Sequence, residues 1–249
     1  MELELYHGLA STCSKKVRLC LYEKGLPFAS HLLNLQKFEQ HLPDYLALNP
    51  KGVVPTLVHR GKPVTESSHI IEYLDENFPQ VPLRPRAPEA RAQIREWLNF
   101  SDTVAYDAVY VPTWTILSAG AMRGLSDAER DALLSRVPTL ERRKRWEQVT
   151  SSGFDRTEIE AAHTKMHECL ERCEAVLDEG PWLAGDNYSL ADIAVVPFVD
   201  RIGNLKPKFL AAPLFPKLNE WLTRMRARPA FAKAFEFSDD PRAATLVNI

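Results

Sequence analysis

The chain has 249 residues, of which 45% are hydrophobic and 26% charged, and its formal net charge is −2. This length allows one large domain or two ordinary ones, and the near-neutral charge argues against nucleic acid or an anionic membrane as a bulk partner. No apolar run approaches the roughly 20 residues of a membrane-spanning helix, and the acidic N-terminus does not resemble a signal peptide. Together with four cysteines, which fit a reduced compartment, these features predict a cytoplasmic protein.

Residues 1–82 are expected to form a small α/β domain, because short strand patterns alternate there with helix patterns. The expected strands cover 3–6, 27–33, 53–58 and 62–65. One helix is expected between Ser11 and Gly25, where glycine suits a left-handed helix end, and another over 67–78. The segment 38–48 looks irregular, with at most one short helix.

Three prolines between 81 and 88 indicate a linker, placed at 83–89, and residues 90–249 are expected to form an all-helical domain. The expected helices cover 90–108, 126–137, 141–148, 157–179, 190–202 and 215–227, with an extended tail from Ser238. Ser126 and Ser189 open capping boxes, and Asp192 in the second box is expected to anchor a local hydrogen-bond network. The dense charge run at 141–148 is typical of a solvated helix face.

Ser11, Thr12, Cys13 and Ser14 cluster where the first strand leads into the first helix. Unpaired backbone N–H groups and the helix dipole stabilise an anion at such a place, and they lower the pKa of a nearby thiol of the protein or of a ligand. In the alternative interpretation Ser14 only caps the helix and Cys13 is a small core residue.

Two further motifs suggest a peptide-like ligand. Pro55 interrupts an apolar strand, and a cis bond before it would turn the backbone of Val54 outward, toward a ligand backbone. Glu66 and Ser67 open the next helix. Ser67 is either an N-cap beside an exposed Glu66, or its hydroxyl and N–H bind a carboxylate while Glu66 binds an ammonium group.

A metal site is not expected. His163 and His167 are spaced i, i+4, and so are Cys169 and Cys173, a spacing that suits metal ligands. At about 100° per residue, however, the two pairs lie roughly 120° apart around a helix, and the cysteines share a stripe of core residues. The sequence also has no glycine-rich phosphate loop and no catalytic triad indicated by spacing.

These motifs together resemble a soluble glutathione transferase over nearly the whole chain. The segments that carry the resemblance are STCSKKVRL (11–19), VPTL (54–57), TESSHIIEYLDENFP (65–79) and WLAGDNYSLADIAVVP (182–197). The resemblance implies a thioredoxin-like N-terminal domain, an all-α C-terminal domain that supplies the second-substrate pocket, glutathione as co-substrate, and a homodimer.

The resemblance also implies roles for individual residues. Ser11 would activate the glutathione thiol, Val54 before Pro55 would pair with the ligand's backbone, and Glu66 and Ser67 would hold its γ-glutamyl end. Three residues are candidates for the contact with the glycine carboxylate: Gln40, His41 and Lys51. The chain departs here from classes that place a polar or basic residue directly before the Val-Pro pair.

The sub-class remains open at this point. STCS is similar to the start of reductive dehalogenases of the family, in which the cysteine is a nucleophile, and also to the zeta, tau and theta classes. Segments 35–57 and 137–154 are similar to bacterial β-aryl-ether-cleaving transferases. These interpretations all predict that a bound thiolate attacks an electrophilic carbon of a small hydrophobic molecule.

Three alternatives to a simple transferase therefore remain. One is a dehalogenase or isomerase that uses Cys13, with Ser14 as a further candidate for the working group. Another is a non-catalytic binding protein on the same fold, and ether cleavage is the third. Six aromatic residues are candidates for a substrate pocket or for the core: Tyr6, His7, Tyr106, Tyr110, Trp114 and Trp146.

Overall fold

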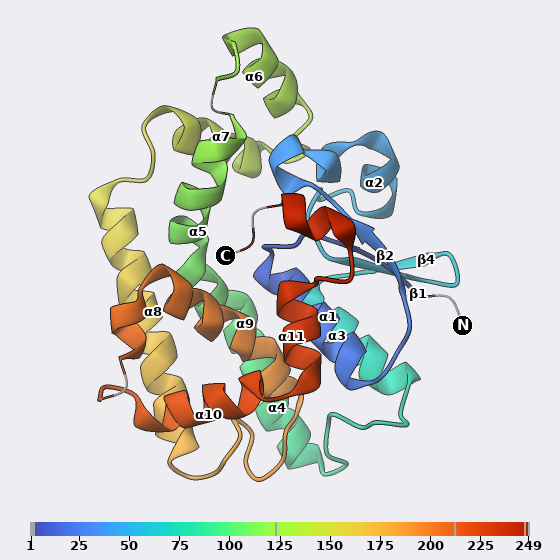
Figure 1. The fold of residues 1–249 in the computed structure, drawn as a ribbon, viewed down its shortest axis with the longest axis vertical. Coiled ribbons are helices and arrows are strands. Elements are labelled where there is room, and N and C mark those ends of the chain that lie inside the picture. The colour runs from blue at the N-terminus through green and yellow to red at the C-terminus, as the bar shows by residue number, and fades with distance from the viewer. Residues whose placement is uncertain (1–2, 123, 212, 247, 249) are drawn as a thin grey trace.

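The computed structural model describes residues 3–122, 124–211, 213–246 and 248, and it places a four-stranded sheet with its helices beside a larger helical part (Figure 1). The strands are β1 (Leu3–His7), β2 (Ala29–Leu32), β3 (Thr56–His59) and β4 (Lys62–Thr65). Their order is β2-β1-β3-β4, with β2 parallel to β1 and the other neighbours antiparallel. This mixed sheet confirms the predicted thioredoxin-like α/β fold of the N-terminal part.

Two prolines and the turn at Arg60-Gly61 explain where β3 and β4 begin and end. β3 starts at Thr56 and not at 53 as predicted, because Pro55 has no N–H to donate to a ladder. Pro63 lies in β4, an edge strand, where a missing donor is tolerated. Arg60 and Gly61 both have positive φ, 54° and 74°, as a tight two-residue hairpin requires.

The N-terminal helices are α1 (Thr12–Glu23), α2 (Pro43–Leu48) and α3 (Ser67–Asn77). The predicted end of α1 is confirmed, since Gly25 has a φ of 61°. α1 and α3 pack against each other through buried residues such as Cys20 and Ile71. A 3-10 turn, Glu39–His41, and α2 occupy the segment 38–48 that the sequence marks as irregular, and another 3-10 turn, Leu35–Lys37, precedes it.

The C-terminal part is helical, as predicted. Its helices are α4 (Pro88–Phe100), α5 (Tyr106–Ala121), α6 (Asp127–Ser135), α7 (Leu140–Ser151), α8 (Arg156–Leu177), α9 (Leu190–Leu205), α10 (Pro216–Arg226) and α11 (Pro229–Glu236). A π-helical turn, Ser101–Ala105, joins α4 to α5, and a 3-10 turn, Pro241–Thr245, follows α11. The predicted helix over 90–108 therefore ends early, at Phe100.

Three parts of this prediction are wrong. α11 is absent from it, since no helix is expected between 227 and Ser238. α5 is missing from it because Pro112 lies inside the helix and its apolar residues show little periodicity, so the sequence reads as broken there. The tail is not extended from Ser238. Phe237 turns the chain with a φ of 50°, and Leu246 packs near Leu9 and Leu32 at the edge of the N-terminal part.

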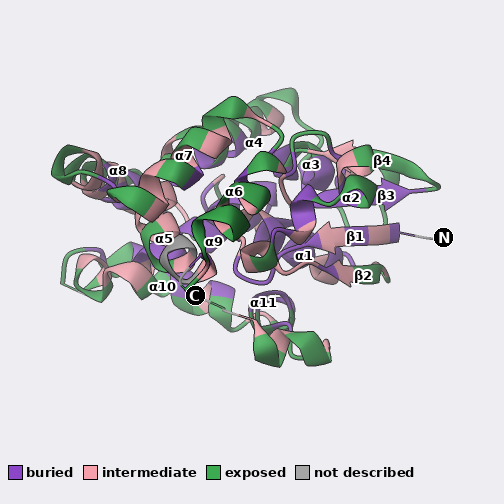
Figure 2. Ribbon diagram, turned by 90° about the horizontal axis from the view of Figure 1, so that it is seen from above, coloured by how far each residue is buried: buried purple, intermediate pink, exposed green. Residues whose placement is uncertain are grey.

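α9 is the centre of the core. Its residues from Leu190 to Ile202 are all buried, and the helix contacts α1, α4 and α5. Buried residues follow β1, α1 and α9, whereas α6 is mostly exposed (Figure 2). The predicted role of Asp192 is confirmed, because its carboxylate accepts hydrogen bonds from the backbone N–H groups of Leu183 and Ser189 and from the indole of Trp221.

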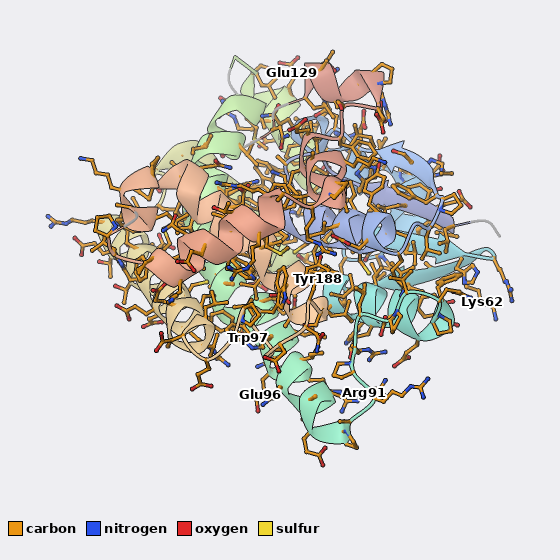
Figure 3. All side chains as sticks on the ribbon, turned by 60° about the horizontal axis from the view of Figure 1, so that its bottom comes forward. Lys62, Arg91, Glu96, Trp97, Glu129 and Tyr188 are labelled. Atoms are coloured by element: carbon orange, nitrogen blue, oxygen red, sulfur yellow. The ribbon has the colours of Figure 1, made fainter. Side chains whose placement is uncertain are left out.

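Polar contacts join the N-terminal part of the chain to the C-terminal helical part. Tyr188, labelled near the centre of Figure 3, donates a hydrogen bond to Glu23 of α1, and Arg228 lies 3.6 Å from the centre of its ring. In the segment before α4, Arg84 is buried against Asp75 of α3. Among the described helices, none combines the length and the apolarity that a membrane crossing needs.

Candidate functional site

The first site segment is the junction of β1 and α1. Ser11 is the N-cap of α1, and its Oγ accepts a hydrogen bond from the N–H of Ser14 at 3.2 Å. The cap is thus Ser11, whereas the alternative interpretation gave this role to Ser14. Since Ser11 accepts here, its own hydroxyl hydrogen is left to donate to a ligand. Ser14 is fully buried, and its Oγ accepts from the N–H of Gly8, also at 3.2 Å.

Cys13 shares features of both of its predicted environments. It is half-buried, it lines both cavities described below, and it also packs against the main hydrophobic core. Burial raises the pKa of its thiol, and the charge of Lys16 and a hydrogen bond with Ser67 only partly oppose this effect. The thiol is therefore protonated at neutral pH, which argues against a reactive thiolate.

The second site segment is the loop before β3. The peptide bond between Val54 and Pro55 is cis, and Val54 lines both cavities. The carbonyl of Val53 accepts hydrogen bonds from the Tyr45 hydroxyl at 2.5 Å and from the Asn49 side chain at 2.9 Å. These bonds hold the loop that carries Val54 against the rest of the N-terminal part.

The third site segment is the start of α3. The N-cap is Glu66, with a φ of 67°, and it makes no side-chain capping bond, so Ser67 is not the cap that one interpretation expected. The first N–H groups of α3 are thus available to an anion, and the Ser67 hydroxyl, which faces Cys13, lies beside them. Glu66 is exposed, and its Oε1 lies 2.7 Å from the Nζ of Lys51. Both charges border the same cavity as Ser67.

The three candidates for the glycine carboxylate lie in different places. Gln40 lines one cavity and Lys51 the other. His41 lines neither cavity, and a Cβ on Gly52 would come within 2.7 Å of its ring. Burial and the charge of Arg142 lower the pKa of His41 to about 4, so its ring is neutral at physiological pH.

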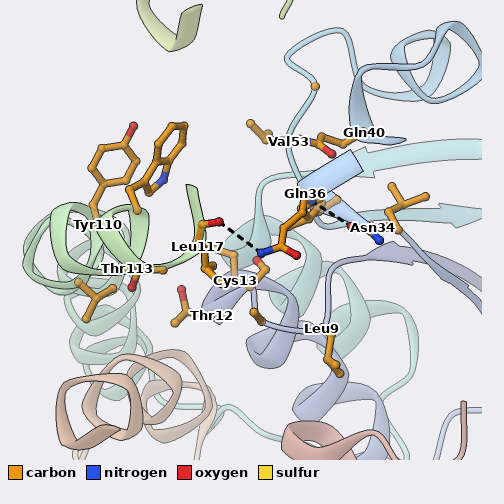
Figure 4. Close-up of a pocket in the computed structure, with 18 of the residues that line it drawn as sticks. Leu9, Thr12, Cys13, Asn34, Gln36, Gln40, Val53, Tyr110, Thr113 and Leu117 are labelled. Atoms are coloured by element: carbon orange, nitrogen blue, oxygen red, sulfur yellow. Dashed lines mark hydrogen bonds between the residues drawn. The ribbon is translucent and has the colours of Figure 1, made fainter. Parts of the chain in front are cut away.

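Two adjoining cavities contain most of the predicted site residues. The aromatic cavity, of about 200 Å³, lies between α1, the loops before β3 and α5 (Figure 4). It is lined by Leu9, Ala10, Ser11, Thr12, Cys13, Leu33, Asn34, Leu35, Gln36, Gln40, Gly52, Val53, Val54, Tyr106, Val109, Tyr110, Thr113, Trp114, Leu117, Arg142, Trp146, Arg201 and Leu246. Gln36 crosses its edge and donates to the carbonyl of Leu117 on α5 at 3.3 Å.

The charged cavity, of about 620 Å³, lies beside the first one. It is lined by Cys13, Lys51, Val53, Val54, Pro55, Glu66, Ser67, Asp102, Tyr106, Asp107, Tyr110, Thr139, Glu141, Arg142 and Arg145. Six residues line both cavities and so mark their boundary: Cys13, Val53, Val54, Tyr106, Tyr110 and Arg142. A ligand of mixed charge in the charged cavity would thus contact an apolar ligand in the aromatic cavity.

Four of the six aromatic residues predicted for a pocket form a continuous series in the aromatic cavity. The ring centres lie 5.5 Å apart for Tyr106 and Tyr110, 5.1 Å for Tyr110 and Trp114, and 4.7 Å for Trp114 and Trp146. The other two lie elsewhere. Tyr6 stacks on His31, and His7 contacts Arg18 and Ser30.

The charge run of α7 is the signal that the sequence interpretation missed. Arg142 and Arg145 line the charged cavity, and Trp146 lines the aromatic one, although the run looked like a solvated helix face. The spacing i, i+3, i+4 places these three residues on one side of a helix. The tryptophan inside the charge run was the available clue in the sequence, and the structure buries it. No cluster of three or more metal-ligating side chains occurs within 3–122, 124–211, 213–246 and 248.

Comparison with known proteins agrees with this geometry. Residues 10–77 match the N-terminal domain of glutathione S-transferases, and residues 133–229 match their C-terminal domain. Protein LigF of Sphingobium sp. strain SYK-6 is 34% identical over 244 residues, which cover 96% of this chain and 95% of LigF. The crystal structure of that protein, named a beta-etherase, superposes with a TM-score of 0.88 over 95% of this chain and all of the other.

Two other relatives bear on the chemistry. The tetrachloro-p-hydroquinone reductive dehalogenase of Sphingobium chlorophenolicum is 29% identical over 242 residues, 94% of this chain and 95% of that protein. A glutathione transferase from Burkholderia graminis, solved with two glutathione molecules per subunit, is 25% identical with a TM-score of 0.72, covering 97% of this chain and 89% of that one. The chain therefore belongs to the glutathione S-transferase family, as an enzyme with glutathione as its co-substrate.

Proposed function

We propose that this transferase cleaves β-aryl ethers by transferring the sulfur of glutathione to the carbon that carries the aryl ether. One observation carries the proposal: the chain resembles a β-etherase over 96% of its length, and it has an aromatic cavity directly beside a charged one. The charged cavity suits glutathione, and the aromatic cavity suits an apolar electrophile.

The charged cavity offers partners for each end of glutathione. Glu66 attracts the ammonium group of the γ-glutamyl end, and Ser67 with the first N–H groups of α3 binds its carboxylate. The backbone of Val54, before the cis-proline Pro55, pairs with the cysteinyl unit. We assign the glycine carboxylate to Lys51 or Gln40, because His41 is neutral and lies behind Gly52.

Ser11 is the proposed activator of the thiol. Its free hydroxyl hydrogen donates to the sulfur, and the N-terminus of α1 adds its dipole, so both groups favour the thiolate. The thiolate then attacks the ether-bearing carbon, the C–S bond forms, and the C–O bond breaks with its electron pair on oxygen. A protonated phenol and a glutathione thioether are the products.

A second candidate function, reductive dehalogenation through Cys13, is favoured by the likeness to the hydroquinone dehalogenase and by the position of Cys13 at the cavity boundary. It needs a thiolate that attacks a glutathione adduct by disulfide exchange. The raised pKa of Cys13 disfavours that thiolate, so we place ether cleavage first.

A panel of three substrates tests the proposal: a β-aryl ether, an aryl chloride and a chlorinated hydroquinone, each with glutathione. We expect phenol release and a thioether from the β-aryl ether, unchanged in Cys13→Ser. Dechlorination of the hydroquinone alone, with a mixed disulfide at Cys13 in the mass spectrum, would establish the dehalogenase instead. Retention on immobilised glutathione with no turnover on any substrate would indicate a binding protein.

We also propose a cytoplasmic homodimer. Two-fold dimers are the commonest closed assembly, and the four cysteines are all free, as in a reduced compartment. Light scattering at micromolar concentration should give about twice the chain mass of 28.3 kDa. A mass equal to one chain would refute the dimer.

A further inference from the structure

Tyr106 and Arg142 form a pair of hydrogen-bond donors at the boundary of the two cavities. Tyr106 comes from the first turn of α5 and Arg142 from the first turn of α7, and both line both cavities. The guanidinium of Arg142 lies 5.6 Å from the ring centre of Trp114, and its positive charge acts on the Tyr106 hydroxyl. Its Nε is buried and has no partner among the described residues.

The pair has positive charge and donors but no anion of its own. Arg142 makes no ion pair within the part of the chain that the structure describes. Burial, with a smaller contribution from Cys13, raises the pKa of Tyr106 far above its usual value, so the phenol keeps its proton at neutral pH. A protonated phenol beside a guanidinium is an arrangement that stabilises a developing oxyanion.

The other arginine of the aromatic cavity is already engaged. Arg201 of α9 donates to the Thr113 hydroxyl at 3.1 Å and to the carbonyl of Ala10. It thereby joins α9 to α5 and to the loop before α1. Its two terminal nitrogens have partners within the protein, although its Nε, like that of Arg142, has none among the described residues. Arg142 is therefore the better placed of these two arginines to receive a ligand.

The placement of the pair also fits a displacement reaction. The proposed thiol activator, Ser11, lies at the N-terminus of α1 and lines the aromatic cavity. Tyr106 of α5 and Arg142 of α7 line this cavity too, and both also border the charged cavity. An ether carbon that is attacked at this boundary, and the oxygen that leaves it, therefore lie within reach of both donors.

We propose that Tyr106 and Arg142 are the hydrogen-bond donor and the electrostatic partner of the aryloxide leaving group, an inference that rests on the proposed ether cleavage. As the thiolate forms the C–S bond, the C–O bond breaks and its electron pair moves to the aryl oxygen. Tyr106 donates a hydrogen bond to this oxygen and keeps its own proton, while the positive charge of Arg142 stabilises the aryloxide. The aryloxide then takes up a proton from water, so the products are neutral phenol and thioether.

Leaving-group chemistry separates this role from a merely structural one. The test measures kcat/KM for wild type, Tyr106→Phe and Arg142→Gln with saturating glutathione and two β-aryl ethers, one losing a methoxyphenoxide and one a nitrophenoxide. The methoxyphenoxide is a strong base that concentrates negative charge on its oxygen, whereas the nitrophenoxide spreads this charge over its ring and leaves readily as an anion. We expect losses of roughly 100-fold on the first ether, as for a removed donor to a developing oxyanion, and much smaller losses on the second.

Two controls complete the experiment. Lys144→Gln removes one positive charge from an exposed position of the same helix that lines neither cavity, and it should retain wild-type values on both ethers. An aryl chloride, whose chloride leaves without a proton, reports whether each variant still folds and binds glutathione. Equal losses on both ethers and on the chloride would overturn the proposed stabilisation of the leaving group and leave a role in shaping the cavity. If wild type releases no phenol from either ether, the proposed function itself is wrong.

Discussion

Replacement of Ser11 by alanine tests the proposed activation of glutathione most directly. Ser11 has two separable duties in the structure. Its Oγ accepts the N–H of Ser14 at 3.2 Å as the N-cap of α1, and its hydroxyl hydrogen is available to a ligand in the aromatic cavity. Ser11→Ala removes both, so the change should affect the stability of the protein and the acidity of the bound thiol.

The size of each effect follows from the groups involved. A free cysteine-type thiol has a pKa of about 8.5, and lowering it by about two units requires roughly 2.7 kcal/mol of thiolate stabilisation. One hydroxyl donor to an anion contributes about 1.5–3 kcal/mol, and the helix N-terminus about 0.3–1 kcal/mol. Loss of the donor should therefore raise the pKa of bound glutathione by about 1–2 units. Loss of the cap should cost about 1 kcal/mol of unfolding free energy.

The assay is a pH titration of the ultraviolet thiolate absorbance with saturating glutathione, followed by urea unfolding of the same samples. Ser14→Ala is the matched control, because it also shortens a serine of this segment, yet its Oγ is bonded to Gly8 and lines neither cavity. It should lose stability and leave the thiol pKa unchanged. If Ser11→Ala also leaves that pKa unchanged, the thiolate is held by backbone N–H groups and the reasoning is refuted.

Glu66→Ala or Ser67→Ala should weaken glutathione binding by about 1.5–3 kcal/mol, because each removes a hydrogen bond to a charged group; equal affinities in calorimetry would contradict the assignment. Asp192→Ala should lower the unfolding free energy by about 3–5 kcal/mol, since it leaves the Trp221 indole and two backbone N–H groups buried without an acceptor. A urea midpoint equal to that of wild type would exclude this role. The pKa of His41 is about 4 in the folded protein against 6.5 in the unfolded chain, so the unfolded state binds more protons between these values. The contribution of His41 to the unfolding free energy therefore falls as pH drops from about 6.5 to 4. His41→Gln should thus lose less stability than wild type between pH 7 and pH 5 in urea titrations, and an equal loss would show that His41 is not the titrating group.

The sequence patterns predict elements well where a local rule and the tertiary structure demand the same conformation. β4 begins and ends as predicted because the Arg60-Gly61 turn specifies its hairpin, and the capping box at Ser189 gives the start of α9. Prediction fails where a local rule is overridden by packing. Pro112 reads as a helix breaker, yet α5 continues through it because its residues pack on α7, α8 and α9.

The candidate site likewise contains residues that local rules predict and residues that only packing brings together. Glu66, Ser67 and Val54 are predictable because each stands at a helix start or next to a proline, where unpaired backbone groups are a local property of the chain. The helical wall of the aromatic cavity is a property of two helices that meet only in the folded protein. A run of charges on α7 looks solvated until α5 places Trp114 beside Arg142 and Trp146.

The division between Ser11 and Cys13 could not be made from sequence for a related reason. Both residues stand at the start of α1, where the dipole and free N–H groups favour an anion whichever side chain is near. Their difference is environmental. Cys13 lies at the boundary of the cavities beside Tyr106, where burial outweighs the positive charge of Lys16 and raises the pKa of its thiol. The same helix end can thus favour a thiolate on a ligand, as we propose for Ser11, while its own cysteine stays protonated.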